Sequence, residues 1–115
     1  MPMNFELPKV AFKPFFDTPV AFVATRTDGV HRGTVACCIF DEGYAEVIDE
    51  TTGTSSRVVE ITLEVHSLAW SAAISTPPQV GDRFKSPMTG REFRVREVSP
   101  TVGSSWAITA REAKT

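Results

Sequence analysis

Residues 57–66 constrain the fold more than any other part of this sequence. Four apolar side chains alternate there with four polar ones, in the order Val59, Glu60, Ile61, Thr62, Leu63, Glu64, Val65, His66. Strict alternation places the two sets on opposite faces of a β-strand. A strand with one buried face and one solvated face is typical of an antiparallel sheet. The segment therefore predicts a half-buried strand in such a sheet.

Other segments of similar pattern flank this strand. We expect strands over residues 20–25, 32–40, 82–86, 91–99 and 105–111, separated by turns rich in glycine and proline. The apolar phase slips at Arg96-Glu97, which indicates a β-bulge or the end of a strand. Strands do not alternate with long helices, so a parallel α/β fold is excluded. The sequence predicts a mainly β fold, a small antiparallel β-barrel or sandwich of about six to seven strands with one short helix near 67–75.

Residues 1–18 have a different composition. They combine prolines, which prevent a continuous helix, with phenylalanines, which are too apolar for a solvated tail. We therefore expect an N-terminal arm over 1–18 and a single barrel domain over 19–112, which a length of 115 residues allows. The arm either folds over the core of its own domain or docks on a neighbouring subunit.

Charge is distributed unevenly along the chain. Residues 41–64 contain seven acidic residues and one basic residue, whereas residues 83–115 contain seven basic and three acidic residues. Such asymmetry gives contacts between copies an orientation, although mixed charge also keeps a small domain in solution. Residues 43–55 are acidic, rich in Thr and Gly, and without sustained periodicity, so we predict a long loop there.

The sequence lacks the motifs that carry most catalytic chemistry. It contains no Cys-x-x-Cys, no His-x-x-x-His, no glycine-rich nucleotide loop and no Gly-x-Ser-x-Gly. Cys37 and Cys38 are adjacent and point to opposite faces of a strand, so we expect two reduced thiols, with Cys37 in the core. We predict no enzyme, no cofactor and no metal site. A ligand-binding barrel would need a polar pocket near His31 or His66.

Single-stranded nucleic acid is an alternative partner, because small β-barrels often bind single strands. Basic residues gather toward the C-terminus, at Arg83, Lys85, Arg91, Arg94 and Arg96. Phe93 and Trp106 are in phase with apolar neighbours and are expected to point inward, which leaves the basic residues without an aromatic stacking platform. The net charge of −2 also argues against a general nucleic-acid binder. We therefore expect no specific nucleic acid. A run of about 18 apolar residues is absent, so we expect no membrane partner either.

Two parts of the sequence resemble a known family. The first part runs from Val80-Gly81-Asp82-Arg83-Phe84, through a turn at Gly90 and an aromatic-led strand ending in Val98-Ser99-Pro100, to Gly103-Ser104-Ser105-Trp106. The second part is Arg32-Gly33 with Phe40-Asp41-Glu42, ahead of an acidic segment. Together they resemble the lambda-type phage head–tail joining (tail attachment) proteins over residues 32–112.

The resemblance implies a structural virion protein of a tailed phage or prophage, made in the cytoplasm of the bacterial host and located at the virion neck. Its copies would form a ring that joins the DNA-filled head to the tail, between a head-completion or portal-side protein and a tail terminator protein. Free copies would be monomers or weak oligomers, without cofactor or catalysis. Candidate interface residues, each of which could also be ordinary surface or cover the core, are Phe12, Phe15 and Phe16 in the arm, Tyr44, Glu46, Asp49 and Glu50 in the loop, and Arg91, Arg94 and Arg96 on the last hairpin.

Overall fold

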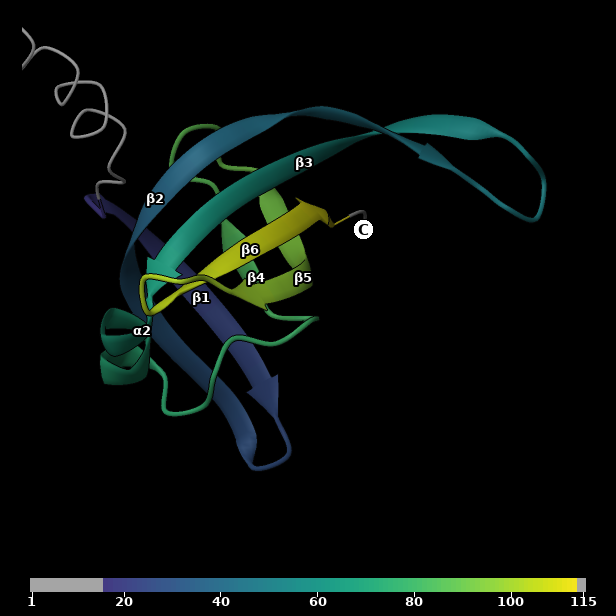
Figure 1. The fold of residues 1–115 in the computed structure, drawn as a ribbon. Coiled ribbons are helices and arrows are strands. Elements are labelled where there is room, and N and C mark those ends of the chain that lie inside the picture. The colour runs from purple at the N-terminus through teal and green to yellow at the C-terminus, as the bar shows by residue number, and fades with distance from the viewer. Residues whose placement is uncertain (1–15, 114–115) are drawn as a thin grey trace, which may run out of the picture.

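A computed structural model describes residues 16–113 of the chain. The strands are β1 (Thr18–Arg26), β2 (Gly29–Ile48), β3 (Ser55–His66), β4 (Arg83–Lys85), β5 (Glu92–Pro100) and β6 (Ser105–Glu112), and the helix α2 (Ser67–Ala73) follows β3. They pair in the order β1-β2-β3-β6-β5-β4, and antiparallel pairing of β4 with β1 closes a barrel (Figure 1). The predicted mainly β fold with one short helix is confirmed, and of the two expected architectures, barrel or sandwich, the structure has the barrel.

The core fills the inside of this barrel. Alternate residues of the strands point inward, as the sequence pattern predicts, and Ile61, Leu63 and Val65 of β3 are almost fully buried. Phe22 lies at the centre of an aromatic cluster, with ring centroids 4.8 Å from Trp70 and 5.0 Å from Phe84. Packed aromatic rings stabilise a fold beyond the contribution expected from the apolar area that they bury.

Helix α2 packs against the barrel through Trp70, which is buried. The Nδ1 atom of His66 accepts a hydrogen bond from the backbone N–H of Leu68 and so caps the start of the helix. Gly33 of β2 permits a close approach, because a Cβ atom built there would lie 2.8 Å from the Cβ of Ala73. His66 is therefore a capping residue at the join between β3 and α2.

Strand β2 is much longer than predicted, and the predicted loop over 43–55 is wrong. The strand continues to Ile48, and β3 begins at Ser55, so only a short turn separates them. The pairing of β2 with β3 shifts register between Ile39 and Asp41, which marks a β-bulge at Phe40. The bulge reverses the phase of inward and outward residues, and this is why alternation is hard to see along 29–48.

The last two strands contain the other irregularity that the sequence indicates. The register between β5 and β6 shifts between Val95 and Glu97, so the slip in phase at Arg96 is a β-bulge within a continuous strand. Strand β1 begins at Thr18, two residues before the expected start of the β pattern. The small displacement follows from Pro19, which can lie in an edge or terminal strand position.

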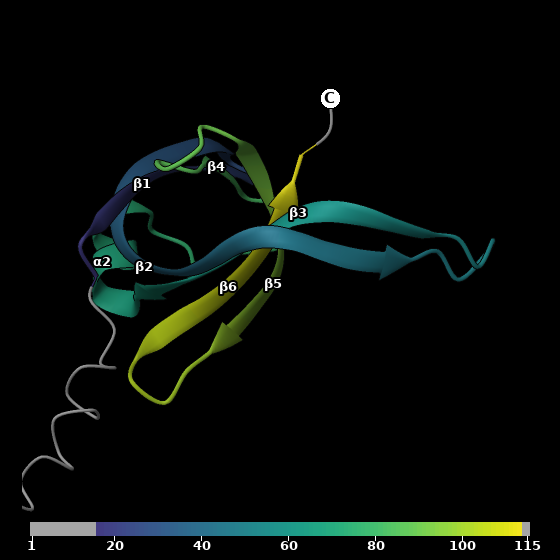
Figure 2. The same ribbon diagram turned by 90° about the horizontal axis from the view of Figure 1, so that it is seen from above.

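Strands β2 and β3 continue beyond the barrel as a two-stranded hairpin (Figures 1 and 2). Strand β1 pairs with β2 only as far as Cys37, and β6 pairs with β3 only from Glu60 onward, so the distal parts of both strands have one paired edge each among the described residues. Viewed from above, the hairpin leaves the barrel on the side opposite α2 (Figure 2). At about 3.3 Å per residue, the stretch of β2 from Phe40 to Ile48 is about 26 Å long.

Candidate functional site

The projecting hairpin, defined here as residues 40–59, exposes large apolar side chains. Phe40 is 57% exposed, Tyr44 65% and Ile48 66%. After the bulge, Tyr44 lies opposite Val59, whose side chain belongs to the inner face of the barrel. This face of the hairpin therefore continues the core-facing side of the sheet into solvent, where nothing in the described chain covers it.

A cation–π contact and an acidic residue share this face with Tyr44. The guanidinium carbon of Arg57 lies 4.7 Å from the centre of the Tyr44 ring. Arg57 is also the cross-strand neighbour of Glu46. A cation–π contact at an exposed position contributes only about 0.5–1 kcal/mol, so this one adds little to the stability of the hairpin.

The end of the hairpin, defined here as the tip and comprising residues 46–54, is acidic. It contains Glu46, Asp49 and Glu50 and no basic residue. Asp49 shapes the turn, since its backbone N–H donates to the carbonyl of Thr54 at 2.8 Å and its carboxylate accepts from the N–H of Thr51 at 2.9 Å. Gly53 has a φ of 72°, which allows the chain to reverse there. Glu50 is exposed and points its charge into solvent.

Arginines form a row across the outside of the barrel. Arg83 of β4 pairs in register with Arg94 of β5, and Arg94 pairs with Arg111 of β6. Like charges directly opposite one another destabilise a sheet. The row ends at Glu60 of β3, which lies opposite Arg111 and accepts a hydrogen bond from its Nε atom at 3.2 Å.

A cleft of about 300 Å³ opens where this row meets the base of the hairpin. Its lining residues are Val58, Arg94, Arg96, Arg111, Glu112 and Ala113, and we call it the arginine cleft. Ion pairs within residues 16–113 engage Arg111 but neither Arg94 nor Arg96. Both of these side chains are exposed, so the cleft presents unneutralised positive charge.

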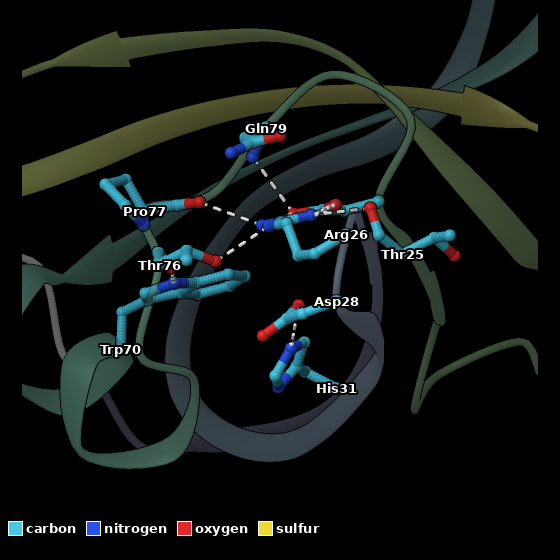
Figure 3. Close-up of polar contacts among 9 residues, drawn as sticks. Thr25, Arg26, Asp28, His31, Trp70, Thr76, Pro77 and Gln79 are labelled. Atoms are coloured by element: carbon cyan, nitrogen blue, oxygen red, sulfur yellow. Dashed lines mark hydrogen bonds and ion pairs between the residues drawn. The ribbon is translucent and has the colours of Figure 1, made fainter.

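A second hollow, around Arg26, is structural. Arg26 donates from Nη1 and Nη2 to the two carboxylate oxygens of Asp82 at 2.6 and 3.0 Å. Its Nε donates to the hydroxyl of Thr76 at 2.7 Å (Figure 3). The hydrogen bond to Asp82 raises the pKa of Arg26 above its ordinary value. The remaining N–H groups donate to the carbonyls of Pro77 and Thr25, so all five donors of this guanidinium are used and none is left for a ligand.

The histidines do not form a site. The Nε2 atom of His31 lies 2.8 Å from the carboxylate of Asp28 in an exposed turn (Figure 3). His66 caps α2, and its ring packs against Phe16 with centroids 6.1 Å apart. Among residues 16–113, no group of three His, Cys, Asp or Glu side chains is placed to hold a metal ion. In the same part of the chain, no helix has the length and apolar character needed to cross a bilayer.

The structure distributes the candidate interface residues over three places. Tyr44 and Glu46 lie in strand β2 of the hairpin, and Asp49 and Glu50 lie in its turn. Arg94 and Arg96 share the arginine cleft, joined by Arg111, which sequence reasoning did not select. Arg91 is separate, with its Nε atom 3.7 Å from Glu112. Phe16 contacts His66, whereas Phe12 and Phe15 lie outside the described residues.

Comparisons with known proteins give one relevant result. No protein-family model matches the sequence, and no curated protein sequence matches it. A chain from a structure described as the virion of a native gene transfer agent (GTA) particle is similar in fold, with a TM-score of 0.54 and 21% sequence identity. The similarity covers 87% of this chain and 96% of that chain. The two chains share a fold over nearly their whole length.

Proposed function

We propose that this chain is a structural protein of a tailed-phage-like virion, and that copies of it form the neck ring that joins the DNA-filled head to the tail. The fold that it shares with a chain of a gene transfer agent virion supports the first part. The sequence resemblance over residues 32–112 to the head–tail joining proteins supports the second.

The projecting hairpin is the observation that carries this proposal. Exposed apolar patches on soluble proteins mark interaction sites, and Phe40, Tyr44 and Ile48 place three large side chains on a hairpin with no core of its own. An isolated two-stranded hairpin is marginally stable in water. A partner that covers this hairpin therefore supplies the packing that its own barrel does not.

In this role the chain contacts three kinds of partner. Its partners are other copies of itself in a ring, a head-completion or portal-side protein on one side, and a tail terminator protein on the other. Free copies are monomers or weak oligomers, because the hairpin gains its packing on assembly. The role requires neither catalysis nor a cofactor.

Joining of separated particles tests the proposal. DNA-filled heads are prepared from a strain in which the gene is deleted, mixed with free tails, and supplied with the purified full-length protein. We expect joined particles to appear in proportion to added protein and infectivity or gene transfer to return. Tyr44→Ser combined with Ile48→Ser should abolish joining, whereas Val102→Ser, at an exposed turn residue, should not. Heads that stay unjoined with active wild-type protein would refute the proposal.

Binding of single-stranded nucleic acid remains the second candidate, because the arginine row forms a basic strip across three strands. Phe93 is buried beneath this strip and Trp106 is half-buried, so neither offers a free ring for base stacking. A mobility shift of a labelled oligonucleotide that weakens steeply with salt would favour this function. The absence of a shift at low salt would exclude binding of single-stranded nucleic acid as the function.

A further inference from the structure

We propose that the acidic tip of the hairpin of one copy binds in the arginine cleft of the next copy, so that copies join head to tail. The inference rests on the proposed function, and it names the partner of both surfaces as a second copy of this chain. It goes further by assigning which side chains meet: Glu46 and Glu50 from one copy, and Arg94 and Arg96 from the other.

Two of the three arginines that line the cleft lack a counter-charge, and the carboxylate that also lines it, Glu112, is paired with Arg91. Arg111 is partly neutralised by Glu60, but Arg94 lies between Arg83 and Arg111 in the row, and Arg96 bulges from the same strand. Neither Arg94 nor Arg96 has an ion-pair partner in the described part of the chain. Cross-strand repulsion of this kind is relieved when carboxylates approach from outside.

The hairpin tip offers the matching chemistry. The tip contains no basic residue over 46–54, although Arg57 lies opposite Glu46 across the hairpin. Glu50 is exposed and forms no ion pair with any described residue. Ile48 sits between the acidic positions and is 66% exposed. Val58 lines the cleft beside the arginines and offers an apolar contact for Ile48. Charge and apolar character therefore correspond on the two surfaces, with acidic residues facing arginines and Ile48 facing Val58.

A copy cannot fill its own cleft. Val58 is the hairpin residue that lines the cleft, and Glu46, which pairs with the neighbouring Arg57, lies on the opposite face of the hairpin. Glu50 lies farther out, in the turn at the end of the hairpin. The hairpin runs away from the barrel in both views (Figures 1 and 2). Because the two surfaces are different and point in different directions, the contact is heterologous, and repeated contacts of this kind close into a ring when the rotation permits.

Charge exchange between the two surfaces provides the test. The cleft variant carries Arg94→Glu and Arg96→Glu, and the tip variant carries Glu46→Lys and Glu50→Lys. The matched control is Arg32→Glu, an exposed position near the opposite end of β2, where the strand pairs with β1. Sedimentation velocity measures self-association of each full-length protein up to about 1 mM in about 20 mM salt, where surface charges are weakly screened. Circular dichroism confirms that each variant is folded.

We expect wild-type protein and the control to associate with similar dissociation constants. For each variant alone, the dissociation constant for self-association should rise about tenfold or more. An equimolar mixture of the two variants should recover association to about the wild-type level, because each then meets an oppositely charged surface. Variants that associate like wild type, a mixture that shows no recovery, or wild-type protein that stays monomeric at every concentration would overturn the inference. So would a cleft variant that loses only oligonucleotide binding while its self-association is unchanged.

The joining experiment separates this inference from the proposed function. If charge exchange restores association but heads remain unjoined with active wild-type protein, the contact stands and the neck role fails. If heads are joined equally well by wild type and by either variant, the neck role stands and this contact fails.

Discussion

Arg26 and Asp82 are 56 residues apart in the sequence and form a buried, bidentate ion pair, with nitrogen–oxygen distances of 2.6 and 3.0 Å. Their side chains are 6% and 2% exposed. The carboxylate also accepts from the backbone N–H of Gln79 at 2.9 Å. The pair therefore fastens the segment between α2 and β4 to the end of β1, and it holds the barrel closed at its shortest strand.

Removing one member of this pair should destabilise the fold strongly. We expect Asp82→Ala to lower the free energy of unfolding by about 3 kcal/mol, because it leaves a buried guanidinium without its counter-charge. Denaturation by urea, followed by tryptophan fluorescence, measures the change. Arg83→Ala, at the adjacent exposed position, is the control and should cost under about 0.5 kcal/mol. Equal effects of the two substitutions would contradict the assigned role of the ion pair.

The contact between β2 and α2 should tolerate no side chain at position 33. A Cβ atom on Gly33 would lie 2.8 Å from the Cβ and 2.9 Å from the carbonyl oxygen of Ala73. Gly33→Ala should therefore cost about 1–3 kcal/mol, since the helix must move away. Gly43→Ala is the matched control in the same strand, because a Cβ atom added at Gly43 would meet no other atom within 4 Å. A thermal melt distinguishes them, and similar melting temperatures would show that the approach is looser than described.

The apolar residues of the hairpin should matter for joining and hardly at all for stability. Phe40→Ser and Tyr44→Ser remove side chains that are more than half exposed, so each should lower the unfolding free energy by about 1 kcal/mol or less, the Tyr44 variant through loss of its contact with Arg57. Joined particles should fall about tenfold or more in the same variants, because the partner loses its apolar anchor. Variants that unfold easily, or that join heads and tails normally, would show that the hairpin serves the fold instead.

The two cysteines should differ in reactivity with pH. Burial raises the pKa of Cys37 to about 12 from an ordinary value of 9.0, with a smaller effect from Cys38. The folded state therefore favours the neutral thiol, so the stability that it contributes is complete below pH 9 and is lost as the pH rises toward 12. Titration with a thiol reagent at pH 8 should label Cys38 first and Cys37 only after unfolding. Equal labelling rates in the folded protein would contradict the buried placement.

The strands that have a buried face could be predicted from the sequence. Residues 57–66 show their alternation because Ile61, Leu63 and Val65 face the core while their neighbours face water. The bulge at Arg96 was visible for the same reason, since an extra residue shifts the apolar phase of a strand whose inner face is otherwise regular.

The hairpin beyond Phe40 could not be predicted in this way. The bulge reverses the phase of β2, and the distal strands have no core to select apolar residues on one face. Its strand character comes instead from pairing with β3, which extends to Ile48 and Ser55. A polar, threonine-rich segment in a two-stranded hairpin therefore has the same composition as a loop.

Long-range partners were also hidden from sequence reasoning. Arg111 is in outward phase with respect to Ala110, but its alignment with Arg94 depends on the register between β5 and β6. The ion pair of Arg26 with Asp82 depends on closure of the barrel through β4 and β1. Local patterns specify which face a residue occupies, whereas pairing register decides which charges meet.

In the role that we propose, this chain is a mechanical coupler at the neck of a virion. Cryo-electron microscopy of DNA-filled heads from the deletion strain, imaged before and after incubation with the purified full-length protein, tests that role most directly. We predict a new ring of density at the portal vertex into which this barrel fits, with its hairpins contacting neighbouring copies. Portal vertices that look identical before and after incubation, with the protein remaining free in solution, would contradict the proposed role.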